Sequence, residues 1–115
     1  MKGPITTHVL DLASGSPASG VPARLEYQAH LDEWHPAGAG TTDSDGRIDN
    51  LLQAGHALQE GSYRLTFELA VYHENAGRDS FHPRVTIDFV VRNTDQHYHV
   101  PLLLSPFGYS TYRGS

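Results

Sequence analysis

The sequence predicts an all-β fold: an antiparallel β-sandwich with one short helix. Three observations support this prediction. Apolar and polar side chains alternate over several short segments, turn-forming residues separate those segments at close spacing, and only one stretch has the composition of a helix. The chain has 115 residues and no internal repeat, so we expect a single domain over residues 1–115 around one core.

The alternation of apolar and polar residues extends from the beginning of the chain to its end. It is most regular in three segments, each of which predicts a strand with one buried face. The others are recognised by their β-branched and aromatic residues. The predicted strands are residues 5–11, 23–30, an edge strand around Trp34, and residues 62–69, 84–92, 97–104 and 107–113.

Turn and cap signals fall between the predicted strands. Asp45-Gly46 is a tight-turn dipeptide, and Ser105-Pro106 leaves only a very short connection between the last two strands. One helix is expected near residues 69–76, where Gly77 is placed to close it. Short strands joined by such turns are typical of a sandwich.

The composition excludes several classes of function. Lys and Arg number 8 against 13 Asp and Glu, so the net charge of −5 argues against a nucleic-acid partner. No apolar run approaches the length of a membrane span. The absence of cysteine excludes disulfides, thiolate zinc sites and cysteine nucleophiles. No signal-peptide pattern is present, so we expect a cytoplasmic protein, or a periplasmic one if a leader was removed.

The chain contains eight histidines, and the alternation places several of them on one side of the predicted sheet. Thr6, His8 and Leu10 share one face of their strand. His97 and His99 share a face of theirs, whereas the opposite face is far more apolar and should be the core side. The imidazoles are therefore expected to point away from the core, toward solvent or another subunit.

From the residues alone, several explanations of these histidines stay open. A His-x-His pair is simply explained as two solvated side chains, and a metal site needs a third ligand, which the sequence does not identify. His73 and His82 are candidates only because the fold could place them anywhere. A serine hydrolase is weakly supported, because no Gly-x-Ser-x-Gly motif occurs and Asp11 lies on the opposite strand face from His8. The periodicity establishes no more than a sandwich with outward-facing histidines.

Three motifs add to this interpretation: Thr-His-Val-Leu-Asp at residues 7–11, His-Tyr-His-Val-Pro at residues 97–101, and Tyr-Arg-Gly-Ser at residues 112–115. With them the sequence resembles the transthyretin-like 5-hydroxyisourate hydrolases over essentially the whole chain. The Tyr-Arg-Gly-Ser motif is the most specific part, since transthyretin itself lacks it. The resemblance implies a two-sheet antiparallel sandwich of about eight strands with one short helix. It also implies a homotetramer, a dimer of dimers with its sites at a central channel.

The resemblance further implies hydrolysis of 5-hydroxyisourate to 2-oxo-4-hydroxy-4-carboxy-5-ureidoimidazoline in urate degradation, without metal or organic cofactor. The implied catalytic residues are His8, Arg47 and His99, with His8 or His99 as the base that activates water and Arg47 as a fixed cation. A supporting role is expected for His97. The implied substrate-binding residues are His8, Arg47, Tyr112, Arg113, Gly114 and Ser115.

The main rival is a carrier of a small hydrophobic ligand in the same channel, as in transthyretin. A carrier for an apolar aromatic ligand should have a less polar channel mouth. Here His8, Arg47, His99 and Arg113 would make the channel cationic and rich in hydrogen-bond donors, which suits an oxidised purine. A purely structural sandwich is a second rival and a metal-dependent hydrolase is a third.

Overall fold

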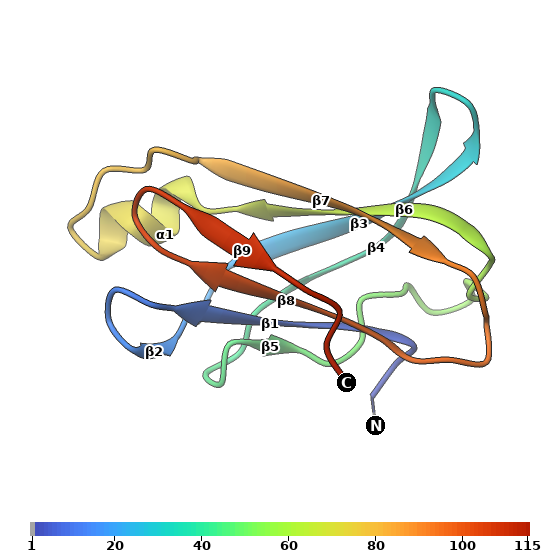
Figure 1. Cartoon of the computed structure of the whole chain (residues 1–115), viewed down its shortest axis with the longest axis horizontal. Coiled ribbons are helices and arrows are strands. Elements are labelled where there is room, and N and C mark those ends of the chain that lie inside the picture. The colour runs from blue at the N-terminus through green and yellow to red at the C-terminus, as the bar shows by residue number, and fades with distance from the viewer. Residues whose placement is uncertain (1) are drawn as a thin grey trace.

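The computed structural model describes residues 2–115 as two β-sheets packed face to face, with one short helix at one end (Figure 1). The first sheet contains, in spatial order, β2 (Ser16–Pro17), β1 (Ile5–Asp11), β8 (Tyr98–Leu104) and β9 (Tyr109–Thr111), and β5 (Arg47–Ile48) also pairs with β1. The second sheet contains β4 (Glu33–Thr41), β3 (Pro22–His30), β6 (Gly61–Glu68) and β7 (Arg84–Val91). The predicted all-β sandwich is confirmed.

One strand pair departs from the antiparallel pattern that the sequence predicts. β1 and β8 run parallel, from Ile5 beside Tyr98 to Asp11 beside Leu104, whereas the other pairs named above are antiparallel. A parallel pair needs a long connection, and here the rest of the sandwich supplies it. The register sets Thr6 beside His99 and thereby aligns the outward side chains of the two strands.

The core lies between the two sheets and follows the predicted alternation. In β8 all residues of one face are buried, namely Tyr98, Val100, Leu102 and Leu104, whereas on the other face only Pro101 is. The facing side chains of the second sheet are also buried and include Leu25, Tyr63, Leu65, Phe67 and Val85. This burial of one face of each strand is the main stabilising contribution, and it leaves the opposite face of β1 and β8 free for polar groups.

The helix lies where the sequence places it. α1 spans Ala70–Asn75, and Gly77 ends it by donating its N–H to the carbonyl of Glu74 at 2.9 Å. The N–H of Arg78 donates to the carbonyl of His73, also at 2.9 Å, which completes the usual glycine-terminated helix end.

The last strand is shorter than expected. A strand over residues 107–113 was predicted, but β9 ends at Thr111, and Gly114 then forms an isolated antiparallel bridge with His99. The difference arises at Pro101, which this register sets opposite Tyr112: proline has no N–H to donate, and its carbonyl accepts the hydroxyl of Thr111 at 2.7 Å. The C-terminal segment therefore pairs with β8 again, in the same register, at His99.

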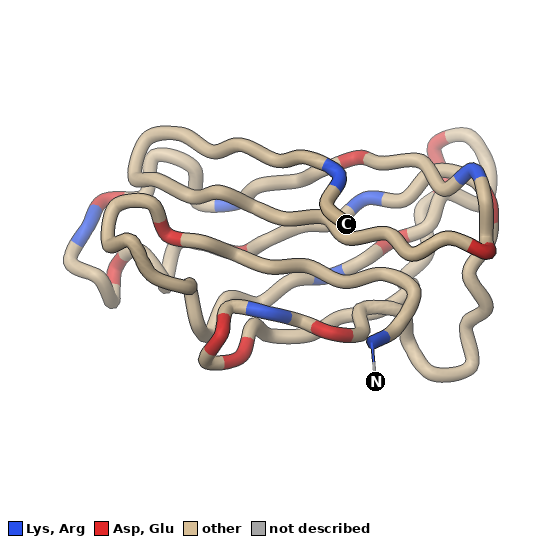
Figure 2. The backbone as a smooth tube through the Cα atoms, turned by 60° about the horizontal axis from the view of Figure 1, so that its bottom comes forward, with Lys and Arg blue, Asp and Glu red and all other residues tan. Residues whose placement is uncertain are grey.

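Charges of both signs are spread along the molecule and do not gather on one side (Figure 2). This distribution agrees with the acidic net charge and gives no basic patch to the part of the chain that the structure describes. Within residues 2–115, no helix has both the length and the apolar character needed to cross a membrane.

Candidate functional site

The candidate site lies on the outward face of β1 and β8, which we call the histidine face: Thr6, His8, Arg47, His97 and His99. A tight turn before β5 delivers Arg47. The N–H of Gly46 donates to the carbonyl of Asp43 at 2.9 Å, and Gly46 has a φ of 76°, which suits glycine. A Cβ on Gly46 would lie 2.5 Å from the carbonyl oxygen of Val9, so only glycine lets the turn approach β1 this closely.

The same turn is braced by the side chain of Asp43, whose Oδ1 accepts the backbone N–H groups of Asp45 at 2.9 Å and Arg47 at 3.0 Å. The bond from the Arg47 N–H is the main reason why the pKa of Asp43 lies below its ordinary value. β5 then pairs with β1, which sets Arg47 directly beside His8 on the same face.

His8 has a defined orientation. Its Nε2 lies 2.9 Å from the carbonyl oxygen of Asp45. Because a carbonyl oxygen can only accept, Nε2 carries a hydrogen, and Nδ1 is the ring atom that remains to accept a proton. The turn that positions Arg47 therefore also orients the neighbouring imidazole.

His99 is half-buried and bonded through its other ring nitrogen. Its Nδ1 lies 2.7 Å from Oγ1 of Thr6, and the same hydroxyl lies 3.0 Å from Nε2 of His97. Burial is the first cause that lowers the pKa of His99 below its ordinary value, and the nearby positive charges of His8, His97, Arg47 and Lys2 lower it further. His99 is thus held neutral near physiological pH, with Nε2 left unbonded.

The C-terminal segment packs directly against His99. The N–H of Gly114 donates to the carbonyl of His99 at 2.8 Å. A Cβ on Gly114 would lie 2.5 Å from Cδ2 of the His99 ring and 3.3 Å from Cγ of Pro101. The glycine of the Tyr-Arg-Gly-Ser motif therefore leaves the space that the His99 ring fills.

The other residues of that motif lie around the same strand end. Nη2 of Arg113 bonds Oε1 of Gln96 at 3.1 Å, and its guanidinium lies 4.4 Å from the centre of the Tyr98 ring. Tyr112 is exposed and, with His99 and Arg113, lines a cavity of about 340 Å³ that also borders β7. Ser115 is exposed at the end of the segment.

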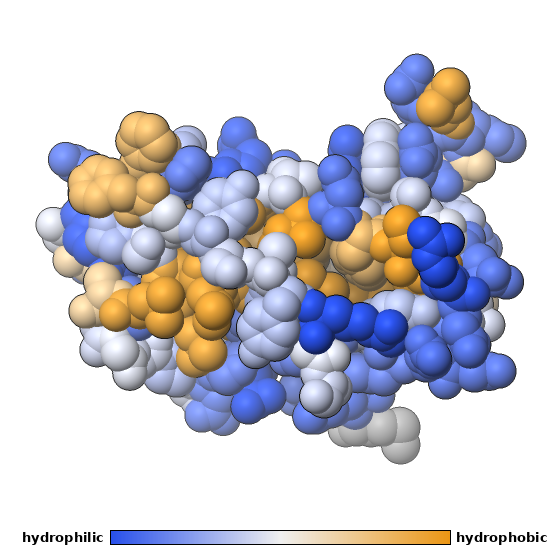
Figure 3. Space-filling model, viewed as in Figure 1, coloured by the Kyte–Doolittle hydropathy of each residue, from blue (hydrophilic) through white to orange (hydrophobic). Residues whose placement is uncertain are grey.

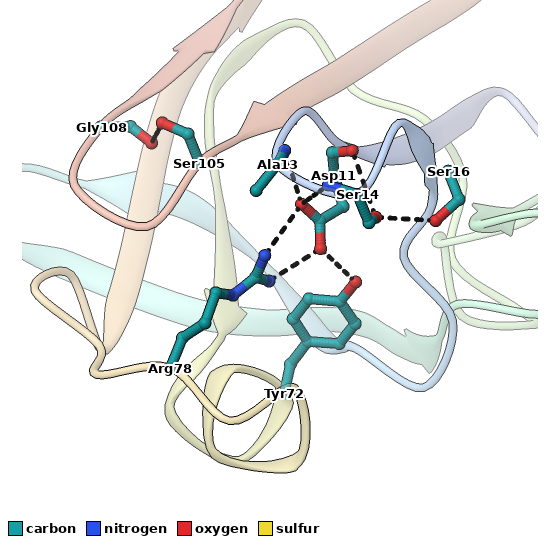
Figure 4. Close-up of polar contacts among 8 residues, drawn as sticks. All are labelled: Asp11, Ala13, Ser14, Ser16, Tyr72, Arg78, Ser105 and Gly108. Atoms are coloured by element: carbon teal, nitrogen blue, oxygen red, sulfur yellow. Dashed lines mark hydrogen bonds and ion pairs between the residues drawn. The ribbon is translucent and has the colours of Figure 1, made fainter.

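The structure separates other candidates from this site. Asp11 lies at the end of β1, where its carboxylate accepts from Nη2 of Arg78 at 2.7 Å and from the hydroxyl of Tyr72 at 2.6 Å (Figure 4). These partners hold the pKa of Asp11 well below its ordinary value although burial opposes them, and Asp11 orients no histidine. His73 is buried on α1, and His82 contacts Phe81 and Tyr109 before β7.

Metal-ligating side chains do not gather in the described residues: no three of His, Cys, Asp and Glu there are placed to share an ion. What the histidine face does bring together is two imidazoles with a free ring nitrogen each, a guanidinium, and the C-terminal segment. Such a set can take a proton from water and stabilise a developing oxyanion.

Sequence reasoning missed the role of Thr6. The alternation placed Thr6 on the face of His8, but its bonds to His97 and His99 depend on the β1–β8 pairing. That pairing joins residues more than 90 positions apart, so no local pattern in the sequence reports it.

The comparisons with known proteins all indicate the same family. The model of the HIUase/Transthyretin family matches residues 5–114. A 5-hydroxyisourate hydrolase from Caulobacter vibrioides is 47% identical over 116 residues, which cover 96% of this chain and 97% of that protein. The structure of Klebsiella pneumoniae 5-hydroxyisourate hydrolase superposes with a TM-score of 0.83 at 37% identity and covers 98% of this chain and 99% of the other. Sea bream transthyretin in complex with thyroxine superposes with a TM-score of 0.88 at 31% identity over 96% of this chain and 94% of that one. The backbone therefore superposes well on both a 5-hydroxyisourate hydrolase and a transthyretin.

Proposed function

This chain belongs to the HIUase/Transthyretin family, and we propose that it hydrolyses 5-hydroxyisourate on the histidine face. The observation that carries the proposal is that His8, Arg47 and His99 lie on one sheet face, with both imidazoles oriented by hydrogen bonds and Arg47 paired beside His8. Identity of 47% to a 5-hydroxyisourate hydrolase supports the same activity. This activity places the protein in urate degradation and makes it a hydrolase that acts on a cyclic amide.

The chemistry divides among the three residues as follows. His99, kept neutral by burial and by neighbouring positive charge, takes a proton from water through Nε2. The hydroxide attacks a ring carbonyl, the carbon–nitrogen bond of the ring breaks, and the leaving nitrogen takes up a proton. Arg47 stabilises the oxyanion that forms during the attack, and His8 uses Nδ1 to bind the substrate or relay the proton. The product is 2-oxo-4-hydroxy-4-carboxy-5-ureidoimidazoline.

The substrate is a small, planar, polar ring, and the C-terminal segment supplies matching groups. Tyr112 gives an aromatic ring and a hydroxyl on the cavity that His99 also lines. Arg113 adds a cation near the same cavity, and Ser115 adds a hydroxyl. Gly114 keeps the backbone close to His99. No step in this scheme uses a metal ion or an organic cofactor.

Assembly is part of the proposal, because the site lies on an outer sheet face that carries apolar groups as well (Figure 3). Exposed side chains near the first sheet include Leu12, Phe107 and Tyr109. We propose a homotetramer, a dimer of dimers, in which the histidine faces line a central channel. A second subunit over this face would exclude water from the imidazoles and lower the local dielectric.

The proposal is tested by adding the protein to 5-hydroxyisourate that has been generated freshly from urate with urate oxidase. The ultraviolet absorbance of the intermediate is followed with chelator present. Decay well above the spontaneous rate at catalytic protein concentrations supports the hydrolase without a metal. Decay at the buffer rate, from protein whose tetramer is verified by sedimentation, refutes it and favours a carrier, for which ligands would then be screened.

A further inference from the structure

The hydroxyl of Thr6 occupies an unusual position between two imidazoles. Oγ1 lies 2.7 Å from Nδ1 of His99 and 3.0 Å from Nε2 of His97. Thr6 is only 3% exposed, His99 is half-buried, and His97 is exposed. The three side chains therefore form one hydrogen-bonded path from the interior of the histidine face to solvent.

A hydroxyl has one hydrogen, which limits how this path can be occupied. If the Thr6 hydrogen points to His97, the oxygen accepts from Nδ1–H of His99, and Nε2 of His99 is bare. If the Thr6 hydrogen points to His99, Nδ1 of His99 is the acceptor, and a neutral His99 must carry its hydrogen on Nε2. Only the first arrangement leaves His99 able to take a proton from water.

We propose that Thr6 is a positioning residue that couples the tautomer of His99 to the protonation of His97. While His97 is neutral, its Nε2 accepts the Thr6 hydrogen, and His99 is the base. When His97 is protonated, its Nε2–H donates to Thr6, and the Thr6 hydroxyl then donates to Nδ1 of His99. The hydrogen of neutral His99 then lies on Nε2, so His99 can no longer take a proton from water. The kinetic consequence rests on the proposed function, whereas the coupling itself does not.

Other charges near the coupled pair must be counted in any pH effect. His8 lies on β1, Arg47 on β5 and Lys2 before β1, and each affects His99 electrostatically. On the far side, Arg113 bonds the carbonyl of His97. The carboxylate of Asp43 lies near enough to His8 to interact with it. None of these groups contacts the Thr6 hydroxyl, so replacing that hydroxyl alone changes the coupling without altering any charge.

The test uses two changes at one position and a matched control at the next. Thr6→Val removes the hydroxyl at nearly constant shape, and Thr6→Ser retains it. Thr7→Val is the control, since Thr7 is equally buried but its hydroxyl donates to the carbonyl of Val100 at 2.6 Å on the core side. His97→Ala removes the other end of the path at an exposed position, so it tests the idea even if Thr6→Val does not fold.

Two measurements are made on each full-length variant. The first is kcat and KM for 5-hydroxyisourate against pH. We expect Thr6→Val and His97→Ala to lower kcat about 10- to 100-fold, by analogy with the loss of a partner that orients a metal-ligating imidazole, with KM little changed. Thr6→Ser and Thr7→Val should keep the wild-type kcat. The acid limb of the profile should lose the contribution of His97 in both Thr6→Val and His97→Ala and keep it in Thr6→Ser and Thr7→Val.

The second measurement needs no substrate: the ¹⁵N shifts of the imidazoles, recorded through a pH titration. In the wild type, His99 should carry its hydrogen on Nδ1, and its shifts should move when His97 titrates. In Thr6→Val, the ¹⁵N shifts of His99 should no longer change as His97 is protonated. Wild-type kcat together with an unchanged His99 tautomer in Thr6→Val and His97→Ala would overturn the proposal. If the wild type fails to hydrolyse 5-hydroxyisourate, the proposed function fails, and the ¹⁵N titration alone decides the coupling.

Discussion

Gly114→Ala should inactivate the enzyme without unfolding it. The added Cβ would lie 2.5 Å from Cδ2 of His99, whereas carbon atoms pack at about 3.5 Å or more. The backbone itself accepts alanine, since Gly114 does not have a positive φ. The conflict is therefore with the imidazole, which must move by about 1 Å, and a displacement of that size at a reacting group costs about 100-fold in rate.

Gly108→Ala is the matched control. It lies in the preceding turn, and its added Cβ would meet only Oγ of Ser105, at an ordinary 3.6 Å. Initial rates of 5-hydroxyisourate decay give kcat and KM for both variants, and thermal unfolding at one fixed protein concentration checks that the assembled protein is equally stable. We expect kcat to fall about 100-fold in Gly114→Ala alone. A Gly114→Ala enzyme with wild-type kcat would refute the claim that the contact with Gly114 positions a catalytic His99.

His99→Ala should fold and assemble but lose at least about 100-fold in kcat, the usual contribution of a general base, as measured in the same decay assay; a wild-type rate would exclude His99 as the base. The pKa of His99 lies below its ordinary value, so in Thr6→Val, where His97 no longer controls the base, kcat/KM should hold as pH falls through about 6.5 and decline only at lower pH, where protonated His99 cannot accept. Arg47→Gln should move that decline to higher pH, because it removes a positive charge near His99. Asp11→Asn should reduce the free energy of unfolding by about 3 kcal/mol or more in urea, because Asp11 is 1% exposed and its partner Arg78 is only 19% exposed. Its kcat, measured where the protein stays folded, should match wild type, and a large loss of kcat would mean that Asp11 acts at the site.

The strands and the helix were predictable because each depends on local pattern. Alternation in β8 separates buried Tyr98 and Val100 from outward His99, and the structure confirms that separation. The helix end at Gly77 follows from a glycine after an apolar segment. Both are properties of a few consecutive residues, so they can be read before the fold is known.

The parallel pairing of β1 with β8 could not be predicted in the same way. Alternation states which side of a strand is buried but not which strand lies beside it or in which direction. For the same reason, the hydrogen bonds of the Thr6 hydroxyl with His97 and His99 could not be predicted. It also hid the ion pair of Asp11 with Arg78, which joins the end of β1 to the segment after α1 (Figure 4).

The candidate site was named from motifs rather than from geometry. His8, Arg47 and His99 were identified by resemblance. The structure adds that the carbonyl of Asp45 orients the ring of His8, that the hydroxyl of Thr6 bonds the ring of His99, and that the turn at Gly46 places the backbone of Arg47. The glycine within the Tyr-Arg-Gly-Ser motif had no physical explanation in the sequence. The structure explains it: the His99 ring on β8 occupies the space that a Cβ at Gly114, in the segment after β9, would need.

The adjacency of β1 and β8 has a consequence for how the protein is made. The bond between Thr6 and His99 closes a loop of 93 residues, so the histidine face is assembled by contacts of very high sequence separation. Such contacts form late in folding, because the entropy of closing the loop is lost before they stabilise anything. The second sheet contains no residue of β1 or β8, so its strands can pair before His99 is brought to His8. Turnover should therefore appear only with the complete fold, and its recovery after denaturation reports the last step of refolding rather than the first.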